Sequence, residues 1–174
     1  MSTNDFFGRV ALVTGGARGI GLACVEELHR RGGAVVIADA GVGIDGSNPD
    51  VAPAQDVAAK FGERIAAFTE DLRGSDAPGR AVEFTVKKFG ALDIVINNAS
   101  AINLTRTEDT PAKRFDLMFD VNVRGTFLTS QAAIPFLKES AKQGRNPHIL
   151  TLSPPLSMKA KWFKNHVAYT MAKY

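Results

Sequence analysis

The stretch VALVTGGARGIGLACVEELHRRG, residues 10–32, decides the fold of this chain. Its first residues form an apolar run that predicts a buried strand, and the later residues have helical spacing. Gly15, Gly19 and Gly21 lie at the junction. Glycine allows a tight reversal there and a close approach of the backbone to a pyrophosphate, whose charge the helix N-terminus stabilises. The alternative is an ordinary strand-to-helix turn, because a glycine triplet alone is a weak signal.

An acidic residue at the end of the second apolar run strengthens the first interpretation. Asp39 closes the run AVVIAD, eighteen residues after Gly21. An acid at an offset of about 20 residues accepts hydrogen bonds from an adenosine ribose. The pattern therefore predicts a dinucleotide site, with NAD favoured over NADP because a 2′-phosphate would lie beside the carboxylate. Arg18 is the alternative contact, since its guanidinium could face such a phosphate.

Short apolar runs alternate with longer segments of helical period along the whole chain. This pattern is typical of a buried parallel sheet with crossover helices. We expect strands at residues 9–15, 34–39, 64–72, 92–100 and 148–153. We expect helices at residues 19–31, 54–61, 76–89 and 111–141, and another from about residue 165. Segment 40–53, rich in Gly, Pro and Asp, is expected to be a surface loop. The predicted fold class is α/β, a doubly wound parallel sheet in one Rossmann-type domain over residues 1–174.

Composition narrows the possible partners. The 174 residues are 45% apolar, enough for one domain with its own core. A net charge of +3 is too small an excess to indicate nucleic-acid binding. The single cysteine excludes an internal disulfide, and no Cys/His spacing suits a metal, so we expect a reducing compartment and no metal site. The N-terminus lacks a signal region, and no long apolar stretch occurs, so we expect a cytoplasmic protein without a membrane partner.

Five ordered motifs resemble the short-chain dehydrogenase/reductase family. They are TGGARGIG at 14–21, DL at 71–72, NNAS at 97–100, VNVRGTF around Asn122, and YTMAK at 169–173. From residue 97 onward the narrower likeness is to the hydroxysteroid dehydrogenase-like protein 2 group. The resemblance implies that Asp71 and Leu72 bracket an adenine ring and that Asn122 holds a proton-relay water. Asn97 and Ala99 would line the cofactor groove. The implied cofactor contacts are Thr14, Gly15, Arg18, Gly19, Ile20, Gly21, Asp39, Asp71, Leu72, Asn98, Ala99, Ser100, Tyr169 and Lys173.

Tyr169 and Lys173 form the candidate proton-transfer pair. At positions i and i+4 of a helix they lie on one face, a turn apart. A phenol is a poor acid or base at neutral pH, but a nearby ammonium favours the phenolate. The resemblance implies that Tyr169 is the acid/base and that Lys173 also contacts the nicotinamide ribose. An ordinary exposed helix pair is the alternative.

The serine that binds the substrate carbonyl in this family has no clear counterpart. Ser153 matches the first serine of the family's strand end, Pro154 stands where the second is expected, and Ser157 lies twelve residues before Tyr169. Proline has neither a hydroxyl nor an N–H. Ser153 is therefore the first candidate and Ser157 the second. In a third interpretation Tyr169 alone polarises the carbonyl.

These features predict an oxidoreductase that transfers a hydride between a nicotinamide cofactor and a secondary alcohol or ketone, with a small apolar substrate. The alternative is a catalytically inactive nucleotide-binding module or fragment on the same scaffold. The resemblance implies further strands after the last helix, so we expect residues 1–174 to be a fragment without turnover. An unprotected edge strand at 148–153 invites pairing, and we expect a homo-oligomer in the full-length form. Lys159, Lys161 and Lys164, interleaved with aromatic residues, could clamp an acyl-CoA phosphate or form a solvated loop.

Overall fold

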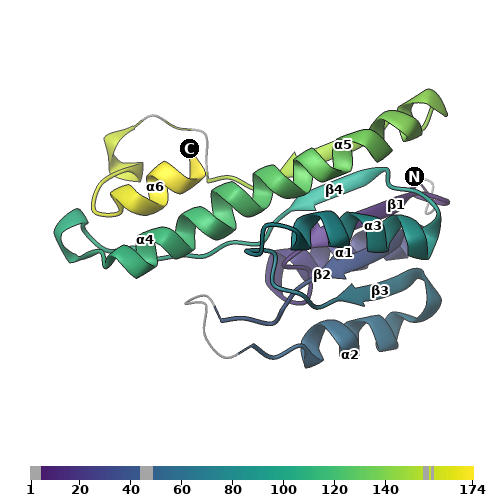
Figure 1. Ribbon diagram of the computed structural model, residues 1–174, viewed down its shortest axis with the longest axis horizontal. Coiled ribbons are helices and arrows are strands. Elements are labelled where there is room, and N and C mark those ends of the chain that lie inside the picture. Colours follow the sequence, from purple (N-terminus) through teal and green to yellow (C-terminus); the bar gives the residue numbers. More distant parts are fainter. Residues whose placement is uncertain (1–4, 44–48, 155–156, 158) are drawn as a thin grey trace.

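The computed structural model describes residues 5–43, 49–154, 157 and 159–174 as a five-stranded parallel sheet with helices on both faces (Figure 1). The strands are β1 (Val10–Thr14), β2 (Ala34–Ala38), β3 (Ile65–Phe68), β4 (Ile94–Asn97) and β5 (His148–Thr151). Their order across the sheet is β3-β2-β1-β4-β5, and every neighbouring pair is parallel. The chain therefore changes direction across the sheet between β1 and β4. At such a switch point the connections leave a crevice at the carboxyl ends of the strands.

The helices also follow the predicted order. They are α1 (Gly19–Arg30), α2 (Ala52–Phe61), α3 (Ala77–Phe89), α4 (Ala112–Phe119), α5 (Thr126–Lys142) and α6 (Val167–Lys173). Short 3-10 turns lie at η1 (Gly62–Arg64), η2 (Thr107–Asp109) and η4 (Ala160–Trp162). The expected helix 111–141 is interrupted by a π turn, η3 (Asp120–Gly125), which joins α4 to α5. Of the expected loop 40–53, residues 44–48 lie outside the described residues, and α2 already begins at Ala52.

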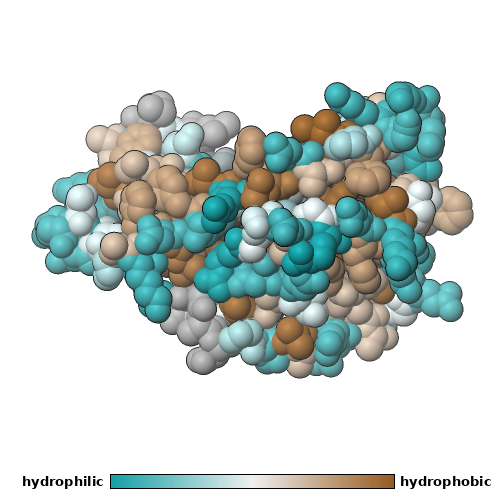
Figure 2. All heavy atoms as spheres, in the orientation of Figure 1, coloured by the Kyte–Doolittle hydropathy of each residue, from teal (hydrophilic) through white to brown (hydrophobic). Residues whose placement is uncertain are grey.

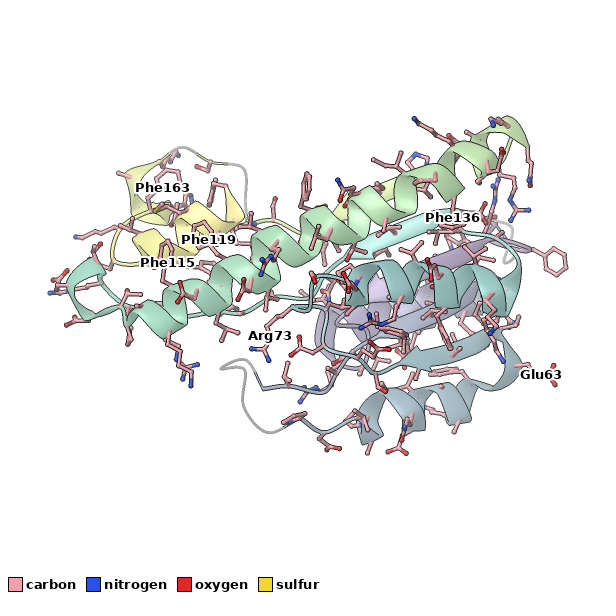
Figure 3. All side chains as sticks on the ribbon, viewed as in Figure 1. Glu63, Arg73, Phe115, Phe119, Phe136 and Phe163 are labelled. Atoms are coloured by element: carbon pink, nitrogen blue, oxygen red, sulfur yellow. The ribbon has the colours of Figure 1, made fainter. Side chains whose placement is uncertain are left out.

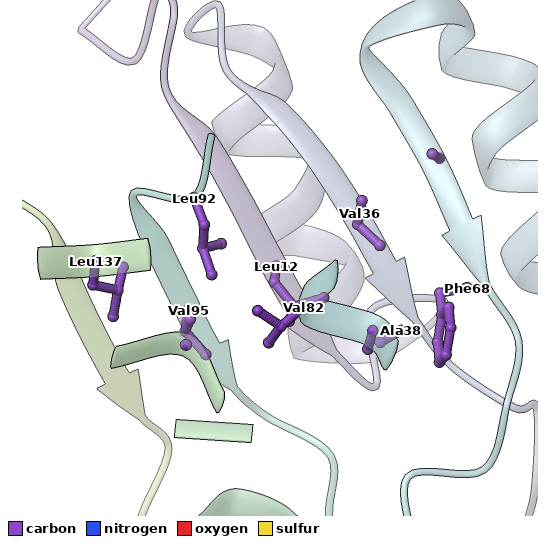
Figure 4. Close-up of a cluster of buried hydrophobic side chains, with 11 residues drawn as sticks. Leu12, Val36, Ala38, Phe68, Val82, Leu92, Val95 and Leu137 are labelled. Carbon is purple, nitrogen blue, oxygen red and sulfur yellow. The ribbon is translucent and has the colours of Figure 1, made fainter. Parts of the chain in front are cut away.

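Both faces of the sheet are buried, which explains why the strands are apolar without alternation. On β1, Leu12 faces α3 and α5, whereas the neighbouring Ala11 and Val13 face α1 and α2. Figure 4 shows the first of these clusters, which includes Leu12 of β1, Val95 of β4 and Val82 of α3. The fold class is thus confirmed as a doubly wound, Rossmann-type parallel sheet.

The strands are shorter than the sequence predicts at their carboxyl ends. β3 ends at Phe68 and β4 at Asn97, whereas the expected runs continue to residues 72 and 100. Beyond these points the backbone makes other hydrogen bonds in place of the strand ladder. The N–H groups of Asn98 and Ala99 donate to Thr14 Oγ1, and Arg73 N donates to Asp71 Oδ1. β5 is the edge strand, and all four of its residues are exposed.

Two helices extend beyond the carboxyl ends of the strands. α4 and α6 lie together on the left of Figure 1, away from the sheet. They share a third apolar cluster, whose buried members are Ala101, Met118, Ala168 and Ala172. Within the described part of the chain, every helix is too short or too polar to cross a bilayer.

A buried carboxylate ties the amino ends of the sheet to the end of α5. Asp93 is only 1% exposed and accepts hydrogen bonds from Val10 N (2.8 Å) and Ser140 Oγ (2.6 Å). Arg145 donates to it from Nε and Nη2, both at 2.7 Å. Burial raises the pKa of Asp93, but the hydrogen bonds from Arg145, Ser140 and Val10 outweigh it and hold the pKa below its usual value. The charged form of Asp93 is therefore part of the folded structure.

We expect the substitution Asp93→Ala to lower the free energy of unfolding by about 3 kcal/mol, because it leaves the half-buried Arg145 guanidinium and the buried Ser140 hydroxyl without this partner. Glu139→Gln is the control, because Glu139 pairs with Lys142 at the surface and its loss costs no more than about 1 kcal/mol. Urea unfolding followed by circular dichroism measures both. Similar values for the two variants would contradict this role of Asp93.

The pH dependence follows from the direction of the same shift. A carboxyl group with a lowered pKa in the folded state stabilises the fold above its unfolded pKa of about 4. That contribution is lost as the pH falls through the folded pKa. The difference in unfolding free energy between the wild type and Asp93→Ala should therefore be constant from about pH 7 to pH 5 and shrink below about pH 4. A difference that grows on acidification would have the wrong sign for this account.

Candidate active site

The glycine turn between β1 and α1 is closed on one side and open on the other. Gly15 (φ +63°) and Gly19 (φ +55°) adopt the left-handed conformation that favours glycine. A Cβ on Gly21 would lie 2.1 Å from the carbonyl oxygen of Gly15 and 2.5 Å from Asn98 Nδ2, so no side chain fits there. A Cβ on Gly19 would meet nothing within 4 Å. The turn thus presents open space at the N-terminus of α1, where free N–H groups favour an anion.

Hydrogen bonds fasten this turn to the end of β4. Thr14 Oγ1 accepts from the backbone N–H groups of Asn98 and Ala99, both at 3.0 Å. The Asn98 side chain donates in return to the carbonyl oxygens of Thr14 (3.0 Å) and Gly15 (2.9 Å). Asn98 therefore holds the turn in place, and its amide N–H groups face the protein. Thr14, only 4% exposed, links β1 and β4 at the switch point.

A pocket opens at the carboxyl ends of β1, β2, β3 and β4. It brings together six of the predicted cofactor residues, Thr14, Gly15, Asp39, Asp71, Leu72 and Ala99. Its other lining residues were not predicted from the sequence: Ala38, Ala40, Val42, Glu70, Arg73, Val121, Gly125, Thr126 and Thr129. The predicted residues Arg18, Gly19, Ile20, Gly21, Asn98, Ser100, Tyr169 and Lys173 lie outside this lining.

Asp39 joins the glycine turn to the loop after β2. Its carboxylate accepts from the backbone N–H groups of Ala17 (3.0 Å) and Gly41 (2.9 Å), one on each oxygen. Each oxygen keeps a further acceptor site. Arg18 is exposed and donates to the carbonyl oxygen of Val42 at 3.2 Å. The carboxylate is thus part of the pocket wall, whereas the guanidinium of Arg18 lies outside it.

Asp71 and Arg73 form an ion pair on the opposite wall. Asp71 accepts from Arg73 Nε, Nη2 and the backbone N–H, at 2.5 to 3.0 Å. Burial raises the pKa of Asp71, but the hydrogen bonds from Arg73 outweigh it and hold the pKa below its usual value. Figure 3 shows Arg73 extending from the connection between β3 and α3 into the space beyond the strands. No sequence pattern singled out Arg73, because a charged residue in a loop is usually solvated.

The π turn η3 forms the third wall. Val121 and Gly125 line the pocket, and Asn122 between them is buried. Asn122 Oδ1 accepts from Ala101 N and its Nδ2 donates to Ala101 O, both at 2.9 Å. Such turns often occur at functional sites, but hydrophobic period alone cannot separate a π turn from an α-helix. The side chain of Asn122 therefore pins the loop after β4 to the helix.

Unpartnered polar atoms near the pocket fit a polar ligand. Thr129 Oγ1, in the pocket wall, is fully buried and has no hydrogen-bond partner. Ser100 Oγ and Asn97 Oδ1 are also buried without partners. Such atoms carry a free-energy cost unless a water or ligand satisfies them. Together with the open side of Gly19 and the acids Asp39 and Asp71, they suit a dinucleotide.

Tyr169 and Lys173 lie on α6, one turn apart as predicted. Tyr169 is half-buried and packs on the apolar cluster shared by α4 and α6. Lys173 Nζ donates to the carbonyl oxygen of Leu152 at 3.2 Å, which fastens α6 to the end of β5. Burial lowers the pKa of Lys173.

The two candidate serines, Ser153 and Ser157, differ in exposure. Ser153 is exposed, and its hydroxyl donates to the carbonyl oxygen of Pro154 at 3.1 Å. Ser157 is half-buried. The role of each in binding a carbonyl stays a prediction.

A doubly wound parallel sheet with a glycine turn at a helix N-terminus and acids at the ends of β2 and β3 defines a nucleotide-binding protein of the Rossmann class. A family model described as short chain dehydrogenase matches residues 9–173. The chain therefore belongs to the short-chain dehydrogenase family. The whole-chain resemblance seen in the motifs is confirmed, including the narrower group.

Relatives support this membership over nearly the whole chain. Hydroxysteroid dehydrogenase-like protein 2 from Bos taurus is 43% identical over 175 residues, which cover 99% of this chain and 41% of the relative. A short chain dehydrogenase structure from Mycobacterium thermoresistibile has a TM-score of 0.80 at 41% identity, covering 97% of this chain and 59% of that one. A 3-ketoacyl-(acyl-carrier-protein) reductase from Brucella melitensis, complexed with NADH, has a TM-score of 0.81 at 30% identity, covering 95% and 64%. The chain spans about two fifths of the length of the curated relative.

The close contact at Gly21 predicts the effect of adding one methyl group. We expect Gly21→Ala to lower the free energy of unfolding by about 1–3 kcal/mol and to abolish detectable NADH binding, because backbone atoms must move. Gly79→Ala is the matched control, because a Cβ there meets nothing within 4 Å and alanine favours helix α3 by about 0.5–1 kcal/mol. Thermal unfolding and calorimetric titration measure the two effects. Wild-type NADH affinity in Gly21→Ala would show that the turn does not form the binding site.

Proposed function

We propose that this chain forms the cofactor-binding part of an oxidoreductase that transfers a hydride between a nicotinamide cofactor and a secondary alcohol or ketone. The observation that carries the proposal is the pocket at the switch point. There the open glycine turn, Asp39 and the Asp71 wall converge. The bond from Lys173 Nζ to Leu152 O, which holds α6 beside the end of β5, supports a role for this helix next to the pocket. The family membership favours the same reaction class.

The binding roles follow from the chemistry of each wall. The N–H groups at the start of α1 and the space beside Gly19 accept the pyrophosphate. The free acceptor sites of Asp39 hold the ribose hydroxyls. Leu72 and Val121 provide apolar walls for the adenine ring, and Thr129 Oγ1 supplies a buried hydrogen-bonding group.

The proton-transfer roles belong to α6 and η3. The cofactor supplies or accepts the hydride when bound. The Tyr169 hydroxyl donates a proton to the carbonyl oxygen during reduction, and the Tyr169 phenolate accepts the alcohol proton during oxidation. The Lys173 ammonium stabilises the phenolate and contacts the ribose. Asn122 keeps one donor and one acceptor site free after pairing with Ala101, the capacity that a relay water needs.

A catalytically inactive nucleotide-binding module is the second candidate. The observation that favours it is the absence of a serine hydroxyl at Pro154, together with the bond from Ser153 Oγ to Pro154 O. Mixing the protein with NADH and a panel of ketones separates the two, because a module binds NADH without oxidising it. A small apolar substrate, a homo-oligomeric full-length form and a cytoplasmic location stay predictions. The assignment of residues 1–174 to one domain belongs to the same proposal.

Cofactor choice is the first prediction from these roles. We expect at least tenfold tighter binding of NADH than of NADPH, a difference of about 1.4 kcal/mol, because a 2′-phosphate would lie beside the Asp39 carboxylate. The measurement is calorimetric titration with both cofactors. Asp39→Asn should reduce the preference. An equal or reversed preference in the wild type would assign the dominant contact to Arg18.

The two roles of α6 give a second prediction. In a form of the protein that turns over NADH with a ketone, Tyr169→Phe should reduce turnover at least a hundredfold and leave NADH affinity within about twofold. Lys173→Ala should reduce both. Tyr174→Phe, which changes the other tyrosine of the chain, is the matched control and should keep turnover. A Tyr169→Phe variant with more than a few per cent of wild-type turnover would refute the acid/base role.

A further inference from the structure

A basic and aromatic segment precedes the helix that carries Tyr169. We define the basic loop as residues 159–164, which contain Lys159, Lys161, Trp162 and Lys164. From residue 140 to residue 174 the chain has no Asp or Glu, and its basic residues are Lys142, Arg145, Lys159, Lys161, Lys164 and Lys173. The whole chain has a net charge of only +3, so positive charge is concentrated at this end.

The lysine ammonium groups of the basic loop have no acidic partner within the described part of the chain. Arg73, Arg124 and Lys142 each pair with a carboxylate. Lys159, Lys161 and Lys164 are exposed, and in residues 5–43, 49–154, 157 and 159–174 their ammonium groups form no ion pair or hydrogen bond. Three like charges within six residues repel each other and attract a multivalent anion. A carbonyl substrate with several negative charges would satisfy them.

Trp162 adds a flat apolar surface among these charges. Its side chain is 39% exposed, and the Lys161 ammonium lies 4.8 Å from the centroid of its ring. An exposed indole stacks on a nucleobase, with a contribution of about 1–3 kcal/mol. The combination of three ammonium groups and one indole matches a ligand that carries both phosphates and a base.

The basic loop is attached to the catalytic helix. The Phe163 ring packs edge-on against Tyr174, with centroids 5.0 Å apart, and Tyr174 follows Lys173 directly. Lys173 in turn donates to Leu152, where the chain leaves the sheet before this loop. Figure 3 shows Phe163 near Phe119 and Phe115 at α4 and α6, and Figure 2 shows apolar side chains gathered over the same region. An apolar chain beside Tyr169 and an anionic end at the basic loop would therefore be neighbours.

The basic loop is separate from the cofactor pocket. None of residues 159–164 lines the pocket that contains Asp39, Asp71 and Thr129. The N-terminus of α1 already provides the anion site for the dinucleotide. The charges of the basic loop therefore suit a second phosphorylated molecule.

We propose that the basic loop binds the phosphate-bearing end of the substrate, and that the substrate is an acyl thioester of coenzyme A with a carbonyl in the acyl chain. The proposal rests on the proposed function, because the same Tyr169 serves the reaction. The carbonyl carbon accepts a hydride from the reduced nicotinamide, and Tyr169 supplies a proton to the oxygen. The carbonyl becomes a secondary alcohol, the nicotinamide is oxidised, and the thioester bond stays intact.

Trp162 makes the test possible without turnover, because it is the single tryptophan of the chain. Its fluorescence reports the binding of acetoacetyl-CoA and of acetoacetyl-pantetheine, which carries the same acyl group without phosphates. We expect at least tenfold tighter binding of acetoacetyl-CoA at low salt, and a smaller preference as ionic strength rises from about 50 to 500 mM. If the fluorescence does not respond, calorimetry with the same two ligands gives the answer.

The variant Lys159→Gln/Lys161→Gln/Lys164→Gln should lose the preference and keep its affinity for NADH. The matched control Lys87→Gln/Lys88→Gln/Lys138→Gln removes the same charge from exposed lysines of α3 and α5 and should keep the preference. Equal affinities for the two thioesters, with NADH binding intact, would overturn this inference alone. Binding of a thioester on an acidic carrier protein but not of acetoacetyl-CoA would overturn it in favour of a protein partner. Absence of NADH binding would defeat the proposed function, and the thioester titration would still be readable.

Discussion

The contact between Gly21 and the carbonyl oxygen of Gly15 is the constraint on which the remaining structure depends. The N-terminus of α1 lies directly against the end of β1, so closely that a Cβ on residue 21 would lie 2.1 Å from that oxygen. Only glycine at position 21 allows this approach. Asn98 then bridges Thr14 and Gly15 with two hydrogen bonds and fixes the end of β4 to the same point. The crevice between the β1 and β4 connections follows from this arrangement, and the pocket opens there.

Much of this arrangement could be predicted from the sequence because it has local causes. Apolar runs mark β1 to β5, and the glycine spacing marks the turn, so the fold class and the element order agree with the structure. The strand order and the interruption of the long helix at η3 depend on contacts between distant segments. Asn122 pairs with the backbone of Ala101, and hydrophobic period carries no information about that pairing. The sequence prediction extends β3 and β4 too far, because their ends are also set by contacts with distant segments, such as the bonds from Asn98 and Ala99 to Thr14.

The residues of the candidate site likewise fall into those that could be predicted from the sequence and those that could not. Gly15 and Asp39 could be predicted because their residue types have specific chemistry at specific offsets, whereas Thr14 and Asp71 were implied by the family resemblance; the structure brings all four to one pocket. Arg73 and Thr129 were missed because a loop arginine and a helix threonine have no distinctive pattern. The charge distribution separates the two ends of the site, since acids line the cofactor pocket whereas unpaired lysines occupy the basic loop.

The central claim is that the glycine turn, the Asp39 loop and the Asp71 wall together bind a nicotinamide dinucleotide. Backbone amide hydrogen exchange of the 174-residue chain, compared with and without saturating NADH, tests it most directly because it reports each segment separately. The account predicts slower exchange at residues 15–21, 39–42, 71–73 and 97–101, with little change in α2 and at the amino ends of the strands. Unchanged exchange in the first of these segments under saturating NADH, or protection confined to other parts of the chain, would contradict it.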